Sequence, residues 1–242
     1  MYTDYAPIYD AIGQARHNVH LAERVIGWMH AHECFPRKVL DLACGTGMTA
    51  QMFAAQGSNV TGVDCSIAML EIAQAKARDL HQSVAFIKAD MRALSEVSGL
   101  SPASFDCVSC FGALNYLIED NDLTAVLTQV RALLKSGGVL VLSVHSANDY
   151  ATWDYRDEVV YNEHDCMVYH QLCYDPASRL ANRRIAWFVR EIDHWWRGEE
   201  THIERAWSDA EVAQALEDAH LCVELKEAIT EEHKYLYVVR KP

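Results

Sequence analysis

The sequence predicts an α/β fold, namely a doubly wound, mostly parallel, seven-stranded Rossmann-like sheet with an antiparallel β insertion after the fifth strand. Over about residues 36–146, apolar strand-like runs alternate with helix-like runs, as in parallel sheets covered by helices on both faces. Residues 153–206 instead alternate polar and apolar side chains, which is typical of an antiparallel meander. We therefore expect an α/β domain formed by residues 1–150 and 207–242, with an insertion at 151–206 that covers the substrate site.

The first 146 residues supply most of the predicted sheet and its helices. Apolar residues recur at helical spacing between Ala15 and His32, and Ser66 is the expected N-cap of a later helix. A glycine pair, Gly137 and Gly138, is the expected stop of the last helix before the fifth strand. In chain order, the expected strands are residues 38–43, 58–64, 84–90, 105–112 and 139–145, and the expected helices are 15–32, 48–56, 66–80 and 121–138.

The rest of the chain is predicted as the meander followed by a helix and a hairpin. Turns are expected at "DPAS", residues 175–178, and at "RGEE", residues 197–200, because Asp-Pro and Arg-Gly interrupt the alternation there. Ser208 is the expected cap of a helix that follows the meander. In chain order, the expected segments are strands 153–175, 179–196 and 201–207, helix 208–221, and strands 222–230 and 234–241.

Charge and composition exclude several classes of partner. The formal net charge of -13 at pH 7 opposes binding to nucleic-acid phosphates, which needs clustered lysine and arginine. The basic stretch at 179–190 is interpreted as a solvated strand face. No apolar run approaches the roughly 18–20 residues that span a bilayer, and the first residues lack the basic start of a signal peptide. We therefore expect a cytoplasmic protein with no nucleic-acid or membrane partner.

The cysteines do not predict a metal site. "CVSC", residues 107–110, has CxxC spacing, but it lies in an apolar strand pattern where positions i and i+3 point to opposite faces. The sequence holds no second CxxC at zinc-finger distance. We therefore expect buried, reduced thiols and no metal.

The glycine-rich turn "CGTGMTA", residues 44–50, raises the question of what it binds. It lacks the third glycine of a dinucleotide fingerprint and the Gly-Lys of a phosphate-binding P-loop. Asp41 lies just before the turn, where it is badly placed for a pyrophosphate but well placed for an ammonium group or for turn amides. Asp64 and Asp90 end the next two strands, where they suit ribose hydroxyls and an exocyclic amine. Together these carboxylates predict a cationic ligand that carries ribose and adenine.

Five segments in the same order resemble the motifs of class I S-adenosylmethionine-dependent methyltransferases: "VLDLACGTG", "VTGVDCSIAML", "VAFIKADM", "FDCVSCFGALNYL" and "ALLKSGGVLVLSV". "YAPIYD" near the start and "ETHIERAWS" at 200–208 resemble the branch that contains small-molecule, amino-sugar type N-methyltransferases. The resemblance implies S-adenosyl-L-methionine as the cofactor. It also implies an antiparallel seventh strand, for which residues 234–241 are the candidate.

The resemblance implies a cofactor-binding role for residues at each strand end. The glycine turn would approach the methionine part of the cofactor, through Ala43, Cys44, Gly45 and Gly47. Asp64 would hold the ribose, and the adenine would be bound by Cys65, Met69, Asp90 and Met91. Cys110 and Phe111 would lie along the sulfonium, while Tyr9 and Arg16 would close over the cofactor. The alternatives are a helix-core position for Met69, plain packing for Tyr9 and a solvated position for Arg16.

Two residues are candidates for a general base, Tyr116 and His145, because both follow strands at the carboxyl edge of the sheet. Some sugar N-methyltransferases carry histidine at the position of Tyr116. A structural hydrogen bond is the alternative for either residue. "FGALNYL" lacks the Pro-Pro-Tyr motif that is common in enzymes that methylate nucleic-acid bases, so we expect a small-molecule acceptor.

Aromatic residues dominate the predicted insertion. They are expected to line a substrate pocket together with Tyr5, or to build the face of a homodimer, or to pack between strands. These residues are Trp153, Tyr155, Trp187, His194, Trp195 and Trp196.

The predicted function is methyl transfer from S-adenosyl-L-methionine to a small molecule by in-line displacement. An amine nitrogen is favoured over an oxygen, because an amine retains a reactive free-base fraction and needs a catalytic base less. A non-catalytic, cofactor-binding regulatory protein is the alternative of another class. Asp41 and Asp90 disfavour a nicotinamide oxidoreductase.

Overall fold

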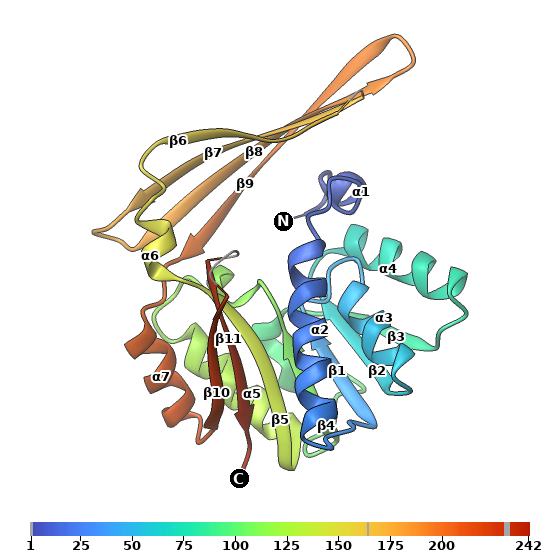
Figure 1. The fold of residues 1–242 in the computed structure, drawn as a ribbon, viewed down its shortest axis with the longest axis vertical. Coiled ribbons are helices and arrows are strands. Elements are labelled where there is room, and N and C mark those ends of the chain that lie inside the picture. The colour runs from blue at the N-terminus through green and yellow to red at the C-terminus, as the bar shows by residue number, and fades with distance from the viewer. Residues whose placement is uncertain (1, 164, 230–232) are drawn as a thin grey trace.

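A computed structural model describes residues 2–163, 165–229 and 233–242 of the chain. Its main sheet has seven strands in the order β10-β11-β5-β4-β1-β2-β3 (Figure 1). Six of these strands run in one direction, while β11 alone runs the other way and pairs antiparallel with both β5 and β10, as predicted for the seventh strand. The fold class is therefore confirmed. The strands are β1 (Lys38–Leu42), β2 (Asn59–Asp64), β3 (Val84–Lys88), β4 (Phe105–Cys110), β5 (Leu134–His145), β10 (Cys222–Ile229) and β11 (Lys234–Arg240).

Helices cover both faces of this sheet, and the sheet separates two apolar clusters. Buried residues of α5 (Asp122–Leu133) and α7 (Asp209–Asp218) pack on one face, and those of α2 (Arg16–Ala31) and α3 (Met48–Ala55) pack on the other. Ser66 caps α4 (Ile67–Asp79) by accepting a hydrogen bond from the Met69 amide, and Ser208 forms a capping box on α7, as predicted. The short elements are α1 (Ala6–Tyr9), α6 (Ala147–Tyr150), η1 (Met91–Glu96) and η2 (Leu114–Tyr116).

The helix expected at 121–138 ends earlier than predicted, at Leu133. Residues from Leu134 onward already belong to β5, where Leu134 pairs with Phe105. Gly137 adopts a left-handed φ of 74° and its amide donates to the Lys241 carbonyl, while the Gly138 carbonyl accepts from the Lys241 amide. The glycine pair therefore shapes the start of a strand instead of stopping a helix.

A second, four-stranded antiparallel sheet in the order β6-β7-β8-β9 rises from the carboxyl edge of the first sheet (Figure 1). Its strands are β6 (Arg156–Glu163), β7 (Cys166–Asp175), β8 (Leu180–Glu191) and β9 (His194–Arg205). The turn predicted at 175–178 is present, since Asp175 accepts hydrogen bonds from the Ala177 and Ser178 amides.

The turn predicted at 197–200 is wrong, because these residues lie inside β9. The chain reverses between β8 and β9 instead, where Ile192 has a φ of 54°. Gly198 is opposite Trp187, and a Cβ atom at Gly198 would come within 2.2 Å of the indole ring. Packing, not chain reversal, thus explains this glycine. The stretch predicted as one strand at 153–175 is likewise divided into β6 and β7.

The helices in the described part of the chain are all too short or too polar to cross a membrane.

Candidate functional site

Two adjoining cavities open at the carboxyl edge of the seven-stranded sheet. The first, here called the edge cavity, lies over the turns that follow β1, β2 and β3. The second, here called the intersheet cavity, lies between this edge and the four-stranded sheet and has a volume of about 380 Å³. Both cavities are lined by Tyr2, Tyr9, Asn18, Gly112 and Tyr116, which therefore mark the passage between them.

Ten of the residues predicted to bind a cofactor line the edge cavity: Tyr9, Ala43, Cys44, Gly45, Asp64, Cys65, Met69, Asp90, Met91 and Phe111. The structure brings together residues that are up to 102 positions apart in the chain, from Tyr9 to Phe111. Asp41, Gly47 and Cys110 lie beneath this wall, and Arg16 is exposed beside Gly13.

The two glycines of the turn have different structural roles. Gly45 has a φ of 53°, and a Cβ atom built there meets none of the described atoms within 4 Å, so its surroundings are open. Gly47 has a φ of 78°, but a Cβ atom there would lie 2.9 Å from the Cβ of Ala73 on α4. Gly47 therefore lets the turn pack against a helix, while Gly45 leaves room for a ligand to approach the backbone.

Asp64 is held in a fixed orientation at the end of β2. Its Oδ2 accepts a hydrogen bond from the Gly45 amide at 2.9 Å, and its Oδ1 accepts one from the Ser66 amide at 2.8 Å. Burial raises the pKa of this carboxyl, and hydrogen bonds from the Ser66, Gly45 and Cys65 amides and from the Cys65 thiol counteract that rise by favouring the charged form. Asp64 lines the edge cavity, where a carboxylate at the end of a strand suits the hydroxyls of a ribose.

Asp90, at the end of the third strand, already has a cationic partner. Arg92 donates to both carboxylate oxygens, with a shortest distance of 2.6 Å from Nη2 to Oδ2. This hydrogen-bonded ion pair lowers the pKa of Asp90. If Asp90 accepts a hydrogen bond from an adenine amine, as predicted, its carboxylate would do so while it is also paired with Arg92. The sequence motif did not indicate Arg92.

Asp41 supports the glycine turn from below. Only 2% of its surface is exposed, and its Oδ1 accepts a hydrogen bond from the Ser109 hydroxyl at 2.7 Å. Burial raises the pKa of Asp41 to about 7. Asp41 does not line either cavity, so its expected contact with a ligand ammonium group is replaced by contacts within the protein.

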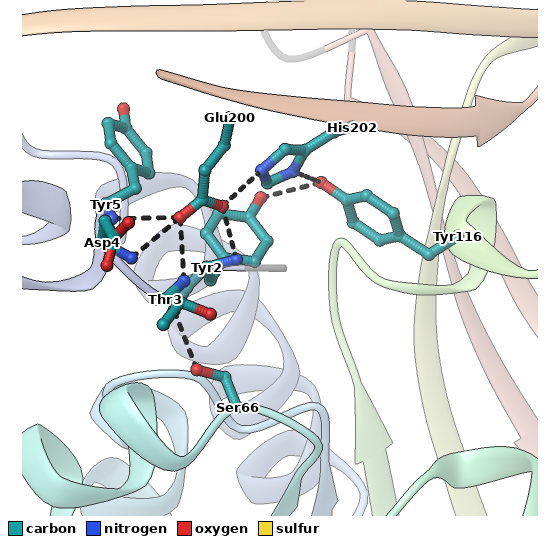
Figure 2. A network of polar contacts seen from close by, with 8 residues as sticks. All are labelled: Tyr2, Thr3, Asp4, Tyr5, Ser66, Tyr116, Glu200 and His202. Carbon is teal, nitrogen blue, oxygen red and sulfur yellow. Dashed lines mark hydrogen bonds and ion pairs between the residues drawn. The ribbon is translucent and has the colours of Figure 1, made fainter. Parts of the chain in front are cut away.

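Tyr116 occupies the passage between the cavities and belongs to a polar network (Figure 2). Its hydroxyl lies 2.8 Å from the Tyr2 hydroxyl and 3.0 Å from Nδ1 of His202. Burial raises the pKa of the Tyr116 phenol and lowers the pKa of the His202 imidazole. A neutral imidazole is therefore available to accept the phenol proton.

His145, the other predicted base, lines the intersheet cavity instead of the passage. Its Nδ1 lies 3.2 Å from Oδ2 of Asp149, and burial lowers its pKa. Asn115 joins the two sheets here, because its side chain accepts from the His145 amide and donates to the Arg205 carbonyl, both at 2.9 Å. His145 thus lies beside Asn115, which connects the two sheets.

Comparison with known proteins identifies the family. Residues 39–138 match the family described as "Methyltransferase domain". A "Putative methyltransferase" of Geobacillus sp. (strain WCH70) is 34% identical over 193 residues, which cover 77% of this chain and 74% of the relative. This chain belongs to the methyltransferase family. The open surroundings of Gly45 and the fixed carboxylate of Asp64 fit S-adenosyl-L-methionine, the cofactor that the sequence motifs predict.

Solved structures show the same fold. An S-adenosylmethionine-dependent methyltransferase from Clostridium acetobutylicum aligns with a TM-score of 0.85 over 98% of each chain at 24% identity. An amino pentose methyltransferase from Micromonospora echinaspora aligns with a TM-score of 0.75 over 100% of this chain and 98% of its own, at 21% identity. Among sequence relatives, a ubiquinone biosynthesis O-methyltransferase of Burkholderia lata is 28% identical over 171 residues, covering 69% of each chain.

The aromatic residues predicted as a substrate pocket of the methyltransferase are dispersed. Trp153 lines the intersheet cavity. Tyr5 and Trp187 are buried against each other, with ring centroids 5.2 Å apart, and line neither cavity. Tyr155 is 81% exposed, and the aromatic residues at the outer end of β9, His194, Trp195 and Trp196, are exposed as well. The pocket interpretation therefore keeps Trp153 alone of this set.

The residues that sequence reasoning missed at this site come mostly from one strand. Glu200, His202 and Glu204 alternate along β9 and turn inward, where His202 and Glu204 are buried. Glu204 accepts a hydrogen bond from Tyr150 at 2.6 Å and pairs with Arg183 at 2.8 Å in the wall of the intersheet cavity. Charged residues at every second position of a strand with aromatic neighbours were the available signal.

Proposed function

We propose that this methyltransferase methylates an amine nitrogen of a small molecule that binds in the intersheet cavity. The observation that carries the proposal is the position of Tyr116 at the passage between the two cavities, with His202 behind it. The volume of about 380 Å³ suits a small molecule, since such sites usually measure roughly 300–1,000 Å³. The likeness to an amino pentose methyltransferase supports the same class of acceptor.

The bound cofactor supplies a methyl group that its sulfonium already activates, so the chain's own contribution is to position the acceptor and to take up a proton. As the acceptor nitrogen gains its fourth bond, one N–H bond breaks and its proton passes to the Tyr116 oxygen. The Tyr116 proton moves in turn to Nδ1 of His202, 3.0 Å away. The resulting imidazolium faces the carboxylate of Glu200, 3.2 Å from Nε2.

The same geometry favours nitrogen over oxygen. Burial raises the pKa of the Tyr116 phenol, so a phenolate is scarce near neutral pH and the pair with His202 is a weak base. Such a base suffices to remove a proton from an ammonium, whereas an alcohol needs a stronger one. Oxygen methylation is the second candidate, because a relative is named as an O-methyltransferase of ubiquinone biosynthesis.

The test is methyl transfer from radiolabelled S-adenosyl-L-methionine to a panel of amino sugars, simple amines, catechols and alcohols. We expect label to enter amines and expect mass spectrometry to place the methyl group on nitrogen. Transfer to catechols with no transfer to amines would overturn the proposal in favour of oxygen methylation.

A further inference from the structure

One carboxylate, that of Glu200, contacts both residues 2–5, of which Tyr2 lines the edge cavity, and His202, the residue behind Tyr116 (Figure 2). Its Oε1 accepts hydrogen bonds from the amides of Thr3, Asp4 and Tyr5, and its Oε2 accepts one from the Tyr2 amide at 2.7 Å. A carboxylate offers about four lone-pair directions, so these amides use most of them. Glu200 therefore fixes the backbone of residues 2–5.

The segment held by Glu200 belongs to the cofactor site. The Tyr2 carbonyl accepts a hydrogen bond from the Ser66 hydroxyl at 2.8 Å, two residues beyond Asp64. The Tyr2 side chain lines both cavities. Tyr2 has a φ of 53°, which is an uncommon backbone conformation for a tyrosine and persists only where surrounding contacts hold it.

The same carboxylate determines how His202 can act. Oε2 of Glu200 lies 3.2 Å from Nε2 of His202, so the proton of the neutral ring belongs on Nε2. Nδ1 is then free of a proton and accepts from Tyr116 at 3.0 Å. The Tyr2 ring packs edge-on against the imidazole, with centroids 4.4 Å apart, and so excludes water from it.

We propose that Glu200 is a positioning residue with two linked roles. It holds residues 2–5 over the edge cavity, and it fixes the tautomer of His202. The inference rests on the proposed function, because it assigns Tyr116 and His202 to proton uptake. With residues 2–5 in place, His202 is dry and neutral and accepts the Tyr116 proton. With these residues displaced, the imidazole meets water, protonates more readily and no longer accepts. The proton acceptor is thus complete only when the cofactor is covered.

The pKa of His202 is set by groups from five segments. Burial lowers its pKa, Glu200 raises it, and the remaining neighbours act from residue 2, η2, β7, β8 and β9. These neighbours are Tyr2, Tyr116, His170, Arg183 and Glu204. Arg183 opposes protonation of His202 and Glu204 favours it, so loss of the Glu200 charge leaves Arg183 less opposed.

The experiment follows the His202 ring by ¹⁵N NMR over a pH titration, with the His202 signal assigned by its loss in His202→Gln. In the wild type we expect the tautomer protonated on Nε2. In Glu200→Gln we expect a lower pKa of His202, because the partner anion is gone. In Tyr2→Ala we expect a higher pKa, because the ring becomes hydrated. Glu199→Gln is the matched control, since Glu199 lies next in sequence but pairs with Arg184 and Arg197 on the exposed face.

Kinetics with an amine acceptor at saturating cofactor give the second measurement. We expect kcat of Glu200→Gln to fall at least about tenfold, with the acid limb of its pH profile moved to lower pH, and Glu199→Gln to match the wild type. Weaker cofactor binding with an unchanged His202 titration and an unchanged acid limb would reduce Glu200 to a structural role and overturn the inference. If no amine is methylated by the wild type, the proposed function fails, while the NMR titration still tests the link between Glu200 and His202.

Discussion

The edge cavity and the intersheet cavity are built in different ways. Around the edge cavity, polar groups are held by near neighbours, as when Asp64 accepts from Ser66 and Asp90 pairs with Arg92. Around the passage and the intersheet cavity, side chains from distant parts of the chain meet, as when Tyr116 contacts His202. The turns of the sheet therefore form most of the first site, which Tyr2 and Tyr9 complete, whereas the second site depends on how the four-stranded sheet is placed. A common cofactor site can thus be combined with a variable acceptor site.

The largest effect is expected for Asp41, which is buried beneath the edge cavity. Because burial raises the pKa of Asp41 to about 7, the folded protein keeps a proton that the unfolded chain releases near pH 4. The stabilising contribution of Asp41 is therefore fully present below about pH 4 and is lost as the pH rises through 7. In urea unfolding between pH 4.5 and 8, we expect the wild type to lose about 3 kcal/mol relative to Asp41→Asn. Parallel stability curves for the two proteins would contradict this.

At the passage, Tyr116→Phe should separate the two cavities functionally. Loss of the hydroxyl removes the proton acceptor, so we expect kcat to fall by about 100-fold. Calorimetry should show unchanged affinity for S-adenosyl-L-methionine, because the phenyl ring remains. Tyr155→Phe, on an exposed tyrosine, is the control and should behave as the wild type. Equal losses in kcat and in cofactor affinity would mean that the two cavities do not act separately.

At the edge cavity, Asp64→Ala should have the converse effect. We expect cofactor binding to weaken by about 1–3 kcal/mol, the usual scale for losing a charge-assisted hydrogen bond. Titration calorimetry measures this loss, and circular dichroism checks that the variant is folded. A folded Asp64→Ala protein with wild-type cofactor affinity would remove the carboxylate from the assigned site.

The smallest effect is expected at Tyr155, which comes just before β6 and outside both cavities. Tyr155 has a φ of 47° and is 81% exposed. Asparagine tolerates this backbone conformation better than tyrosine does, so Tyr155→Asn should leave stability within about 0.5 kcal/mol and leave kcat/KM unchanged. A large loss of kcat/KM would mean that Tyr155 contacts the substrate, as the sequence predicted.

The contrast between the two cavities also explains what could be predicted from the sequence. The turn of Gly45 and the ends of β2 and β3 follow from local patterns, and most of the residues predicted to bind the cofactor therefore line one cavity. Arg16 is exposed and lines neither cavity, because packing decides which face α2 presents and brings Asn18 to both cavities instead.

The acceptor side could not be predicted in the same way. Glu200 and Tyr2 are 198 positions apart, and no local pattern reports their contact. The glycine of the "RGEE" stretch was interpreted as a turn, although Gly198 only makes room for Trp187. A turn at these residues divides β9 in two, so the prediction misses that Glu200, His202 and Glu204 alternate along one strand and face inward.

The most direct test of the account is a crystal structure with the demethylated cofactor and an amine acceptor of the class that the methyl transfer assay selects. The account predicts the acceptor in the intersheet cavity, with its nitrogen at the passage and within about 2.6–3.2 Å of the Tyr116 oxygen. An acceptor bound elsewhere, or one that presents an oxygen to Tyr116 in place of the nitrogen, would contradict it.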